Sequence, residues 1–207
     1  MTDATPCTGP TCENPKRLQI IEAAVAEFGE RGFAEASMDR ISARACVSKR
    51  TVYKHFESKE NLFAAIAEEM SARMAAELDV AYVPGEPIAP QLMRLAEAEG
   101  RIFRSPEAMA MARMWLSETL RAPEMAQKSQ AKIDAHGAFA RFLAAASADG
   151  ALSLDSVDRA ASEFVGLLKA RAFWPHVLGG TVISAEEMQD VQREAVAMML
   201  ARYGVAG

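Results

Sequence analysis

Apolar residues recur at helical spacing along almost the whole chain from Asn14 onward. Gly, Pro and helix-capping residues separate the apolar stripes, and no segment shows the sustained alternation of apolar and polar residues that is typical of a strand. Ala, Leu, Met, Glu and Arg, which favour helices, dominate the composition. The pattern predicts an all-α protein of about nine helices, in which three short N-terminal helices precede a larger helical bundle.

The N-terminal helices are marked by their first residues. Asn14 and Pro15 begin a helix that Gly32 ends, Ser37 can cap a helix over residues 38–45, and Ser48 can cap another over residues 49–55. The apolar residues of the last two helices fall on one side and predict a small shared core: Met38, Ile41, Ala45, Val47, Val52 and Phe56. Two short helices joined by a tight turn in this way form a helix-turn-helix.

The second of these helices carries its polar side chains on the face away from the core: Lys49, Arg50, Thr51, Tyr53, Lys54 and His55. In a helix-turn-helix the second helix enters the DNA major groove, and its N-terminal residues contact base edges. An ordinary solvated helix face is the alternative. The capped turn before these residues and Lys59 after them favour contact with DNA.

The segment from Val47 to Phe63 reads Val-Ser-Lys-Arg-Thr-Val-Tyr-Lys-His-Phe-Glu-Ser-Lys-Glu-Asn-Leu-Phe. It resembles the DNA-binding signature of the TetR/AcrR family of bacterial transcriptional regulators. The resemblance implies that Tyr53 and Lys59 hold phosphates, with Ser37 and His55 as further contacts. It leaves Lys49, Arg50, Thr51 and Lys54 for base edges, with Arg50 suited to guanine and the Thr51 methyl group to thymine.

The remaining helices are predicted from their caps and stripes. One begins at Ser58 and continues its apolar stripe to Leu78, and five more cover residues 88–103, 106 to about 120, 123 to about 147, 155–178 and 185–203. The predicted domains are a flexible arm over residues 1–14, a helix-turn-helix domain over residues 15–63, and a ligand-binding and dimerisation domain over residues 64–207.

Two C-terminal segments, beginning at Ser105-Pro-Glu-Ala-Met and at Asp149-Gly-Ala-Leu-Ser-Leu, are similar to the C-terminal domain of the AefR-like branch of the same family. That branch tends to carry Phe-Pro-Glu where this chain has Ser-Pro-Glu, so the resemblance does not extend to an inherited effector. A homodimer on an inverted-repeat operator is expected, with half-sites one helical turn, roughly 34 to 36 Å, apart or a near multiple of it.

The last two long helices are expected to form the dimer surface. They carry apolar stripes that would pack against a second copy: Val157, Ala161, Phe164, Val165, Leu168, Val191, Ala195, Met198 and Met199. The alternative is that these stripes serve only the protomer's own core.

Met and aromatic residues are unusually dense in the C-terminal part, and Met suits pockets that accept varied apolar shapes. Plain core packing is the alternative for each of them. Together with the family pattern they predict a cavity for a small apolar or amphipathic effector: Met70, Met74, Phe103, Met111, Met114, Trp115, Phe139, Phe142 and Arg171. Other candidates for a polar anchor are Arg101, Arg113, His136 and His176.

Charge is distributed unevenly along the 207 residues. The net charge is −5 overall, but residues 15–63 carry nine basic and seven acidic side chains, so the proposed DNA-binding part is net positive. Of three cysteines, Cys7 and Cys12 lie in the predicted arm, where exposed thiols are favoured over a redox or metal role, and Cys46 is expected to be a small packing residue.

Other classes of protein fit the sequence poorly. No apolar run reaches the roughly 20 residues of a membrane span and no signal peptide opens the chain, so a cytoplasmic location is expected. The three histidines form no metal-ligand motif, and neither a phosphate-binding loop nor a nucleophile elbow is present, so neither an enzyme nor a cofactor is predicted. A helical sensor or protein-interaction module without DNA binding remains the alternative function.

Overall fold

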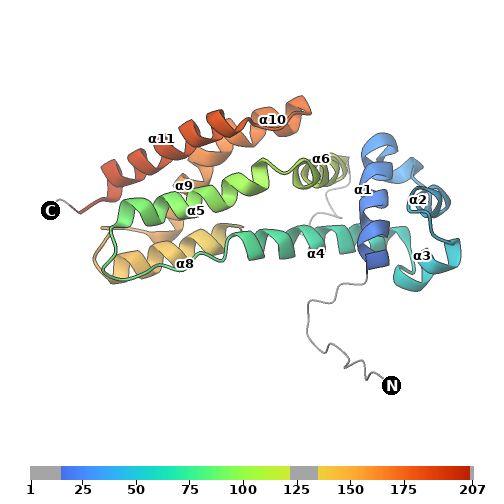
Figure 1. Cartoon of the computed structure of the whole chain (residues 1–207), viewed down its shortest axis with the longest axis horizontal. Helices are drawn as coiled ribbons and strands as arrows, with labels where there is room; N and C mark the ends of the chain where they lie inside the picture. Colours follow the sequence, from blue (N-terminus) through green and yellow to red (C-terminus); the bar gives the residue numbers. More distant parts are fainter. Residues whose placement is uncertain (1–14, 122–134, 206–207) are drawn as a thin grey trace, which may run out of the picture. The chain divides into compact units, whose positions relative to one another are not determined.

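The computed structural model describes residues 15–121 and 135–205, which fold as helices joined by short loops (Figure 1). This confirms the predicted all-α fold class. Two compact units divide the chain between Ile66 and Ala67, a boundary that falls inside helix α4 (Lys59–Glu77). The predicted arm over residues 1–14 lies outside the described residues.

The N-terminal unit contains α1 (Pro15–Glu35), α2 (Met38–Arg44), α3 (Lys49–His55) and the first turns of α4. Helix α1 packs on α2, and α2 packs on α3. The core predicted from the sequence is confirmed for five residues, which are all nearly fully buried: Met38, Ile41, Ala45, Val52 and Phe56. Val47 is half-buried.

Helix α1 does not end at Gly32, where the sequence predicts its last turn. It bends there instead, because Gly32 has a φ of 76° and a ψ of 161°, and the chain resumes a helical path as far as Glu35. A positive φ is readily available to glycine, which lacks a Cβ atom. The bend leaves backbone carbonyl groups near the end of α1 that need partners other than the helix itself.

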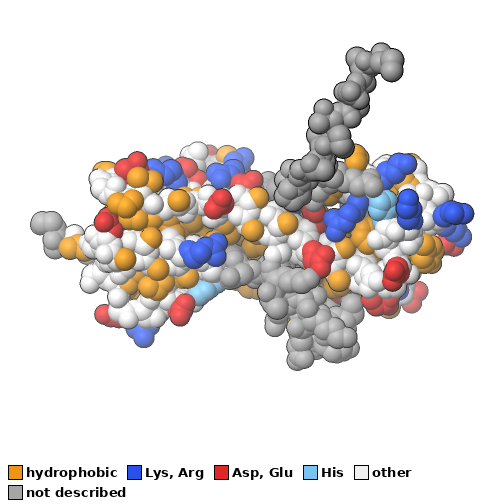
Figure 2. Space-filling model, turned by 90° about the horizontal axis from the view of Figure 1, so that it is seen from below, with side chains coloured by type: hydrophobic (Ala, Val, Ile, Leu, Met, Phe, Trp, Pro, Cys, Tyr) orange, Lys and Arg blue, Asp and Glu red, His pale blue; other side chains and the backbone are white. Residues whose placement is uncertain are grey.

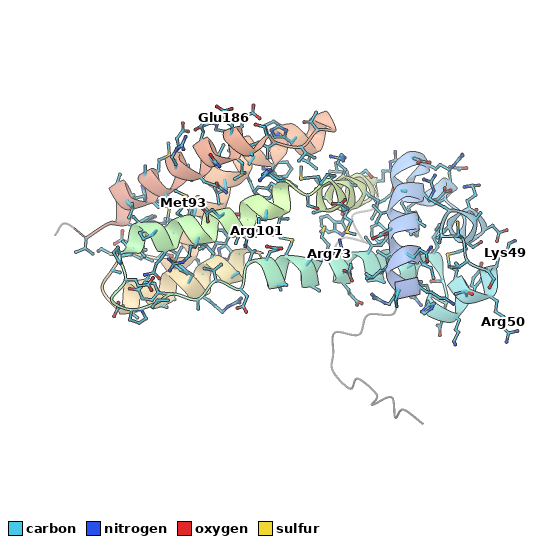
Figure 3. All side chains as sticks on the ribbon, in the orientation of Figure 1. Lys49, Arg50, Arg73, Met93, Arg101 and Glu186 are labelled. Atoms are coloured by element: carbon cyan, nitrogen blue, oxygen red, sulfur yellow. The ribbon has the colours of Figure 1, made fainter. Side chains whose placement is uncertain are left out.

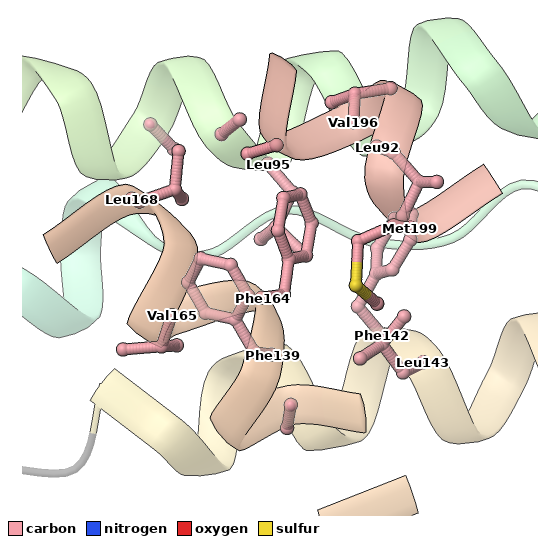
Figure 4. Packing of buried hydrophobic residues seen from close by; sticks show 14 of the residues in the cluster. Leu92, Leu95, Phe139, Phe142, Leu143, Phe164, Val165, Leu168, Val196 and Met199 are labelled. Atoms are coloured by element: carbon pink, nitrogen blue, oxygen red, sulfur yellow. The ribbon is translucent and has the colours of Figure 1, made fainter. Parts of the chain in front are cut away.

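The C-terminal unit holds the rest of α4 together with α5 (Ile88–Phe103), α6 (Pro106–Arg121), α8 (Ala135–Ala148), α9 (Val157–Ala172), α10 (Trp174–Gly179) and α11 (Ala185–Tyr203). Helix α9 is central, because it packs against α5, α8, α10 and α11. Figure 4 shows side chains from α5, α8, α9 and α11 meeting in one core. The rings of Phe139 and Phe164 lie edge to face there, with centroids 5.3 Å apart.

Two predicted helix boundaries in this unit change. The helix expected over residues 155–178 is capped by Ser156 and breaks at Phe173, since Pro175 in the first turn of α10 has no N–H to continue α9. The first part of the helix expected from Pro123 lies outside the described residues. The limits of α5 and α11 agree with the prediction, and α11 begins with the expected capping box of Ser184 and Glu187.

Candidate nucleic-acid interface and ligand cavity

Serine caps position the two helices of the helix-turn-helix. The Ser37 hydroxyl accepts a hydrogen bond from the Arg40 backbone N–H at 3.3 Å, and the Ser48 hydroxyl accepts one from Thr51 N–H at 3.1 Å. Each cap satisfies a backbone donor that the first turn leaves free. The start of α3 is therefore fixed by its own sequence.

A buried carboxylate joins α2 to α1. The side chain of Glu27 is almost fully buried, and Arg40 binds it directly while Arg31 lies 3.6 Å away. Arg44 forms two hydrogen bonds with Glu30 on the next turn of α1. A buried charge is tolerated only when it is paired in this way. These arginines, whose side chains stay partly exposed, therefore hold α2 against α1 and orient the helix-turn-helix.

The exposed face of α3 carries most of the predicted DNA contacts. The side chains of Arg50, Tyr53 and Lys54 are exposed and form no hydrogen bond or ion pair with any other residue that the structure describes. Figure 3 shows Lys49 and Arg50 projecting outward from α3, and Figure 2 shows Lys and Arg side chains gathered over the N-terminal unit. This surface offers cations and a phenol hydroxyl to a polyanion.

The other predicted contacts on α3 already have partners. Lys49 forms an ion pair with Asp39 at 2.5 Å, so it must exchange this carboxylate before it can reach a base. The Thr51 hydroxyl lies 2.8 Å from the Ser48 hydroxyl, which leaves its methyl group as the free end. His55 is half-buried, with its ring 6.2 Å from that of Phe56.

Lys59 has a structural role that the sequence did not reveal. Its ammonium group donates hydrogen bonds to the carbonyl oxygens of Phe33 at 2.6 Å, Ala34 at 3.0 Å and Ala36 at 3.1 Å. An ammonium group has three donors, and all three are used. Without DNA, the side chain thus satisfies the carbonyl groups that follow the bend at Gly32, and its donors are not free for the phosphate that the resemblance implies.

The expectation for Cys46 is also wrong. The residue is exposed, and its φ of 50° lies in the left-handed region that glycine usually occupies. The tight turn between α2 and α3 requires this conformation, which directs the side chain out of the core.

The C-terminal unit contains a cavity of about 570 Å³, within the usual size range of small-molecule sites. Its wall is formed by residues of α4, α5, α6, α9 and α10 and is mostly apolar. Five of the predicted residues line it: Met70, Met74, Phe103, Met111 and Trp115. The wall also includes Ile102, Met109, Phe173 and Trp174, which are further apolar and aromatic residues of the kind that predicted the cavity.

Four predicted cavity residues lie elsewhere. Phe139 and Phe142 belong to the core between α8 and α9, because α8 faces that side of the bundle (Figure 4). Met114 is buried on α6 but is absent from the wall. Arg171 is exposed and forms an ion pair with Glu194 on α11, so it is directed away from the cavity.

Of the other candidate polar anchors for a ligand, one lines the cavity and three do not. Arg101 lines the cavity and binds Glu77 at 2.7 Å. Arg113 is not part of the wall, and its Nη1 is buried without a partner in the described part of the chain. His136 lies within hydrogen-bond distance of the Asp158 carbonyl group, and His176 within that of the Thr181 hydroxyl.

A buried carboxyl group on α5 was missed altogether. Glu99 is fully buried, neither of its oxygens has a hydrogen-bond partner among the residues that the structure describes, and burial raises its pKa to about 7 despite the opposing charge of Lys169. Lys169 lines the cavity, and its ammonium group lies 5.9 Å from the centre of the Phe173 ring. Only an interruption of the apolar stripe of α5 could have pointed to Glu99.

The expected dimer surface is largely contradicted. The structure buries seven of the nine residues in the protomer's own core: Ala161, Phe164, Val165, Leu168, Val191, Ala195 and Met199. Val157 is partly buried against the same core, while Met198 is 54% exposed. The inward stripes serve the protomer because α9 is enclosed by its own neighbours, so a partner would have to meet the outer faces of α9 and α11.

Within residues 15–121 and 135–205, no group of three or more acidic, His or Cys side chains could hold a metal ion. Every helix in these ranges is too short or too polar to cross a bilayer. Cys7 and Cys12 fall outside the described residues.

The fold and the exposed face of α3 define a helix-turn-helix protein with a helical C-terminal unit. Residues 20–66 match the model for bacterial regulatory proteins of the tetR family, and residues 90–205, more than half of the chain, match the C-terminal domain of AefR-like transcriptional repressors. The chain belongs to the TetR family. This membership confirms the sequence resemblance and places the chain among regulators rather than enzymes.

Individual relatives agree with this assignment. A TetR family transcriptional regulator from Pseudomonas syringae pv. tomato is 37% identical and superposes with a TM-score of 0.83, over 94% of this chain and all of that one. The flavonoid-responsive regulator FrrA is 27% identical, with a TM-score of 0.67 over 93% and 98% of the two chains. The transcriptional repressor SCO4008 of Streptomyces coelicolor is 39% identical over 64 residues, which are 31% of this chain and about a third of that protein.

Proposed function

We propose that the chain is a ligand-responsive transcriptional repressor that binds an inverted-repeat operator as a homodimer. The observation that carries the proposal is the exposed face of the capped helix α3, on which the side chains of Arg50, Tyr53 and Lys54 have no hydrogen-bond or ion-pair partner within the described residues. The match of residues 90–205 to the C-terminal domain of AefR-like transcriptional repressors supports repression.

The side chains divide into two roles by their chemistry. Arg50 has the paired donors that match guanine in the major groove, the Thr51 methyl group suits thymine, and Lys49 and Lys54 can reach further base edges. Tyr53, Ser37 and His55 would bind phosphates and fix the position of α3 on the duplex. Lys59 contributes indirectly, by holding the end of α1.

A second copy would pack on the outer faces of α9 and α11. These faces share a shallow hollow lined by Gly166, Leu167, Ala170 and Met198 among others. A Cβ atom at Gly166 would have no neighbour within 4 Å, so a partner helix could approach the backbone closely there. TetR-family regulators form homodimers, and two recognition helices are needed to bind two half-sites.

Release from DNA would follow binding of a small apolar or amphipathic effector in the cavity. Helix α4 carries Met70 and Met74, which line the cavity, and it begins at Lys59, which binds the end of α1. An effector that favours one position of α4 would shift the population toward a conformer with lower operator affinity. Operator and effector would then weaken each other's binding by the same factor. The structural neighbour FrrA is flavonoid-responsive.

A regulator of this kind would act in the cytoplasm, where the bacterial chromosome lies. Fragments of the source genome retained by the purified protein would identify the operator, and a salt titration would then test the mode of binding. The affinity for duplex DNA must fall steeply as the salt concentration rises, because Lys and Arg side chains displace counterions from the phosphates when the protein binds. A protein with no duplex affinity at any salt concentration would be a sensor only, and the proposal would be wrong.

A further inference from the structure

The cavity wall carries a surplus of positive charge. Its described residues include three cations and a single acid: Arg73, Arg101, Lys169 and Glu77. Arg101 binds Glu77 at 2.7 Å. Arg73 binds Glu69, a buried residue one turn earlier on α4, at 2.8 Å. These two pairs leave Lys169 as the one cation of the described wall without a carboxylate in contact.

An aromatic ring holds the ammonium group of Lys169 at the wall. The group lies 5.9 Å from the centre of the Phe173 ring, which packs in turn on the ring of Phe103 with centroids 5.5 Å apart. All three side chains line the cavity. The side chain of Lys169 forms no hydrogen bond or ion pair with any residue in the described ranges, so its three N–H donors lack a protein acceptor there. A ring face attracts an ammonium group without neutralising its charge.

Glu99 does not serve as a partner for Lys169. It is not part of the wall, and its oxygens form no hydrogen bond with any described residue. Burial raises the pKa of Glu99 to about 7, so near neutral pH a large share of this carboxyl group is protonated and uncharged. The charge of Lys169 is therefore incompletely balanced by the part of the chain that the structure describes.

We propose that the cavity binds an apolar molecule that carries one carboxylate, which forms an ion pair with Lys169. The inference rests on the proposed function, since it names the chemistry of the effector for the same cavity. The apolar body would pack against the side chains of Met70, Met109 and Phe173, which line the cavity. The carboxylate would supply both the acceptor and the negative charge that the wall lacks at Lys169.

Head groups of other charge fit this wall less well. A ligand cation would be repelled by Lys169, and the one acid of the described wall, Glu77, is already bound by Arg101. A neutral amide could accept a hydrogen bond from Lys169 but would leave its charge unbalanced. For one apolar body, the affinity is therefore expected to fall from the anion to the neutral molecule and then to the cation.

The test uses the full-length protein without DNA and two sets of probes, each with one apolar body and three head groups. One set is para-butylbenzoate, para-butylbenzamide and para-butylbenzamidinium, and the other is octanoate, octanamide and octanamidinium. Isothermal titration calorimetry gives the dissociation constants. The two tryptophans of the chain, Trp115 and Trp174, both line the cavity, so a change in their emission would locate the binding there. In at least one set, we expect the carboxylate to bind about tenfold more tightly than the amide, and the amidinium to bind more weakly than the amide.

Variants assign this preference to Lys169. Lys169→Met should bring the carboxylate to within about twofold of the amide and leave the affinity for the amide itself unchanged, whereas Lys169→Arg, which keeps the charge, should retain most of the preference. Arg171→Met is the matched control, because Arg171 lies on the same helix but pairs with Glu194 outside the cavity. Circular dichroism would verify that each variant is folded.

The pair of Arg101 and Glu77 is tested by a double variant, because removing one partner alone would leave the other unpaired. Arg101→Gln combined with Glu77→Gln keeps the net charge of the wall, so the preference for the carboxylate should stay within about twofold of its value in the natural chain. If this variant lost the preference while Lys169→Met kept it, Arg101 would bind the anion and the inference would be wrong.

Three further results would overturn the inference: no carboxylate preference in either set, a preference that survives Lys169→Met, or binding heat without any change in tryptophan emission. Operator binding of the unliganded protein is measured separately. A protein that binds its operator but shows no carboxylate preference would refute this inference alone, whereas one that prefers the carboxylate but binds no duplex would refute the proposed DNA-binding function alone.

Discussion

The ammonium group of Lys59 lies 2.6 Å from the carbonyl oxygen of Phe33 and 4.6 Å from the centre of its ring. Lys59 therefore joins the first turn of α4 to the segment of α1 that follows the bend at Gly32. A residue that the family signature marks for DNA contact thus stabilises the unit that presents the recognition helix.

We expect Lys59→Met to lower the free energy of unfolding by about 1.5 to 3 kcal/mol, since it removes a charged donor from buried or part-buried carbonyl groups. Urea denaturation without DNA would measure the change. Lys54→Met is the control, because Lys54 is exposed and its side chain is unpaired in the described structure. The stability of this variant should hardly change. Its plot of log DNA affinity against log salt concentration should become shallower by about 1. If Lys59→Met showed the Lys54→Met behaviour, Lys59 would be a phosphate contact after all.

Arg50→Ala should relax sequence preference at one base pair by about 1 to 3 kcal/mol, whereas Tyr53→Ala should weaken binding to all duplexes alike. The measurement is binding to a set of operators that each differ at one position. A uniform loss for Arg50→Ala would reassign Arg50 to the phosphate backbone.

Gly100→Ala should destabilise the C-terminal unit by about 1 to 3 kcal/mol. The new Cβ atom would collide with the amide of Gln192, which donates a buried hydrogen bond to the Ala96 carbonyl group, and would press on Met188. Gly29→Ala serves as the control for helix propensity, because nothing lies within 4 Å of its Cβ position; it should stabilise α1 by about 0.5 to 1 kcal/mol. Thermal unfolding of both variants would measure the difference, and equal shifts would show that Gln192 can move aside.

The stability difference between Glu99→Gln and the natural chain should depend on pH. Burial raises the pKa of Glu99 to about 7 from its ordinary value of 4.5, so between these pH values the folded state keeps a proton that the unfolded state has lost. This contribution to stability is fully present below pH 4.5 and is lost as pH rises to 7. The glutamine variant should therefore gain up to about 3 kcal/mol relative to the natural chain between pH 4.5 and 8. A constant difference across that range in urea titrations would mean that Glu99 ionises normally.

Met198→Glu should convert the dimer to a monomer without unfolding it, because Met198 is 54% exposed in the protomer and its charge would meet an apolar partner surface. Sedimentation velocity measures the change, and operator affinity should fall with it. Leu178→Glu on α10 is the control, since Leu178 is 80% exposed and lies outside the hollow on α9 and α11. A Met198→Glu protein that remained dimeric would place the interface elsewhere.

The helices and the helix-turn-helix core could be predicted from the sequence because their determinants are local. Ser48 can cap a helix that begins directly after it, and Val52 faces inward because the residues around it on α3 are polar or charged. Pro175 shows the limit, since the apolar stripe continues across it while the missing N–H of the proline ends one helix and begins another.

The site was predicted less completely, because side-chain partners distant in sequence decide which residues are free. Lys59 and Lys54 look equivalent along the chain, yet only the bend at Gly32 creates acceptors for Lys59. In the same way, Phe164 and Met198 both belong to apolar stripes, and only the enclosure of α9 separates core from surface. Glu99 could not be assigned, since its importance depends on the absence of a partner.

Arg40 forms an ion pair with Glu27, and Arg44 forms one with Glu30, so these two positive charges of the N-terminal unit are already neutralised. These two guanidinium groups stabilise the fold, and Lys49 forms an ion pair with Asp39. Few cations are therefore left to bind the phosphates of a duplex. The N-terminal unit of one protomer should therefore bind a single half-site with low affinity and dissociate rapidly. Recognition would then require both half-sites of the palindrome.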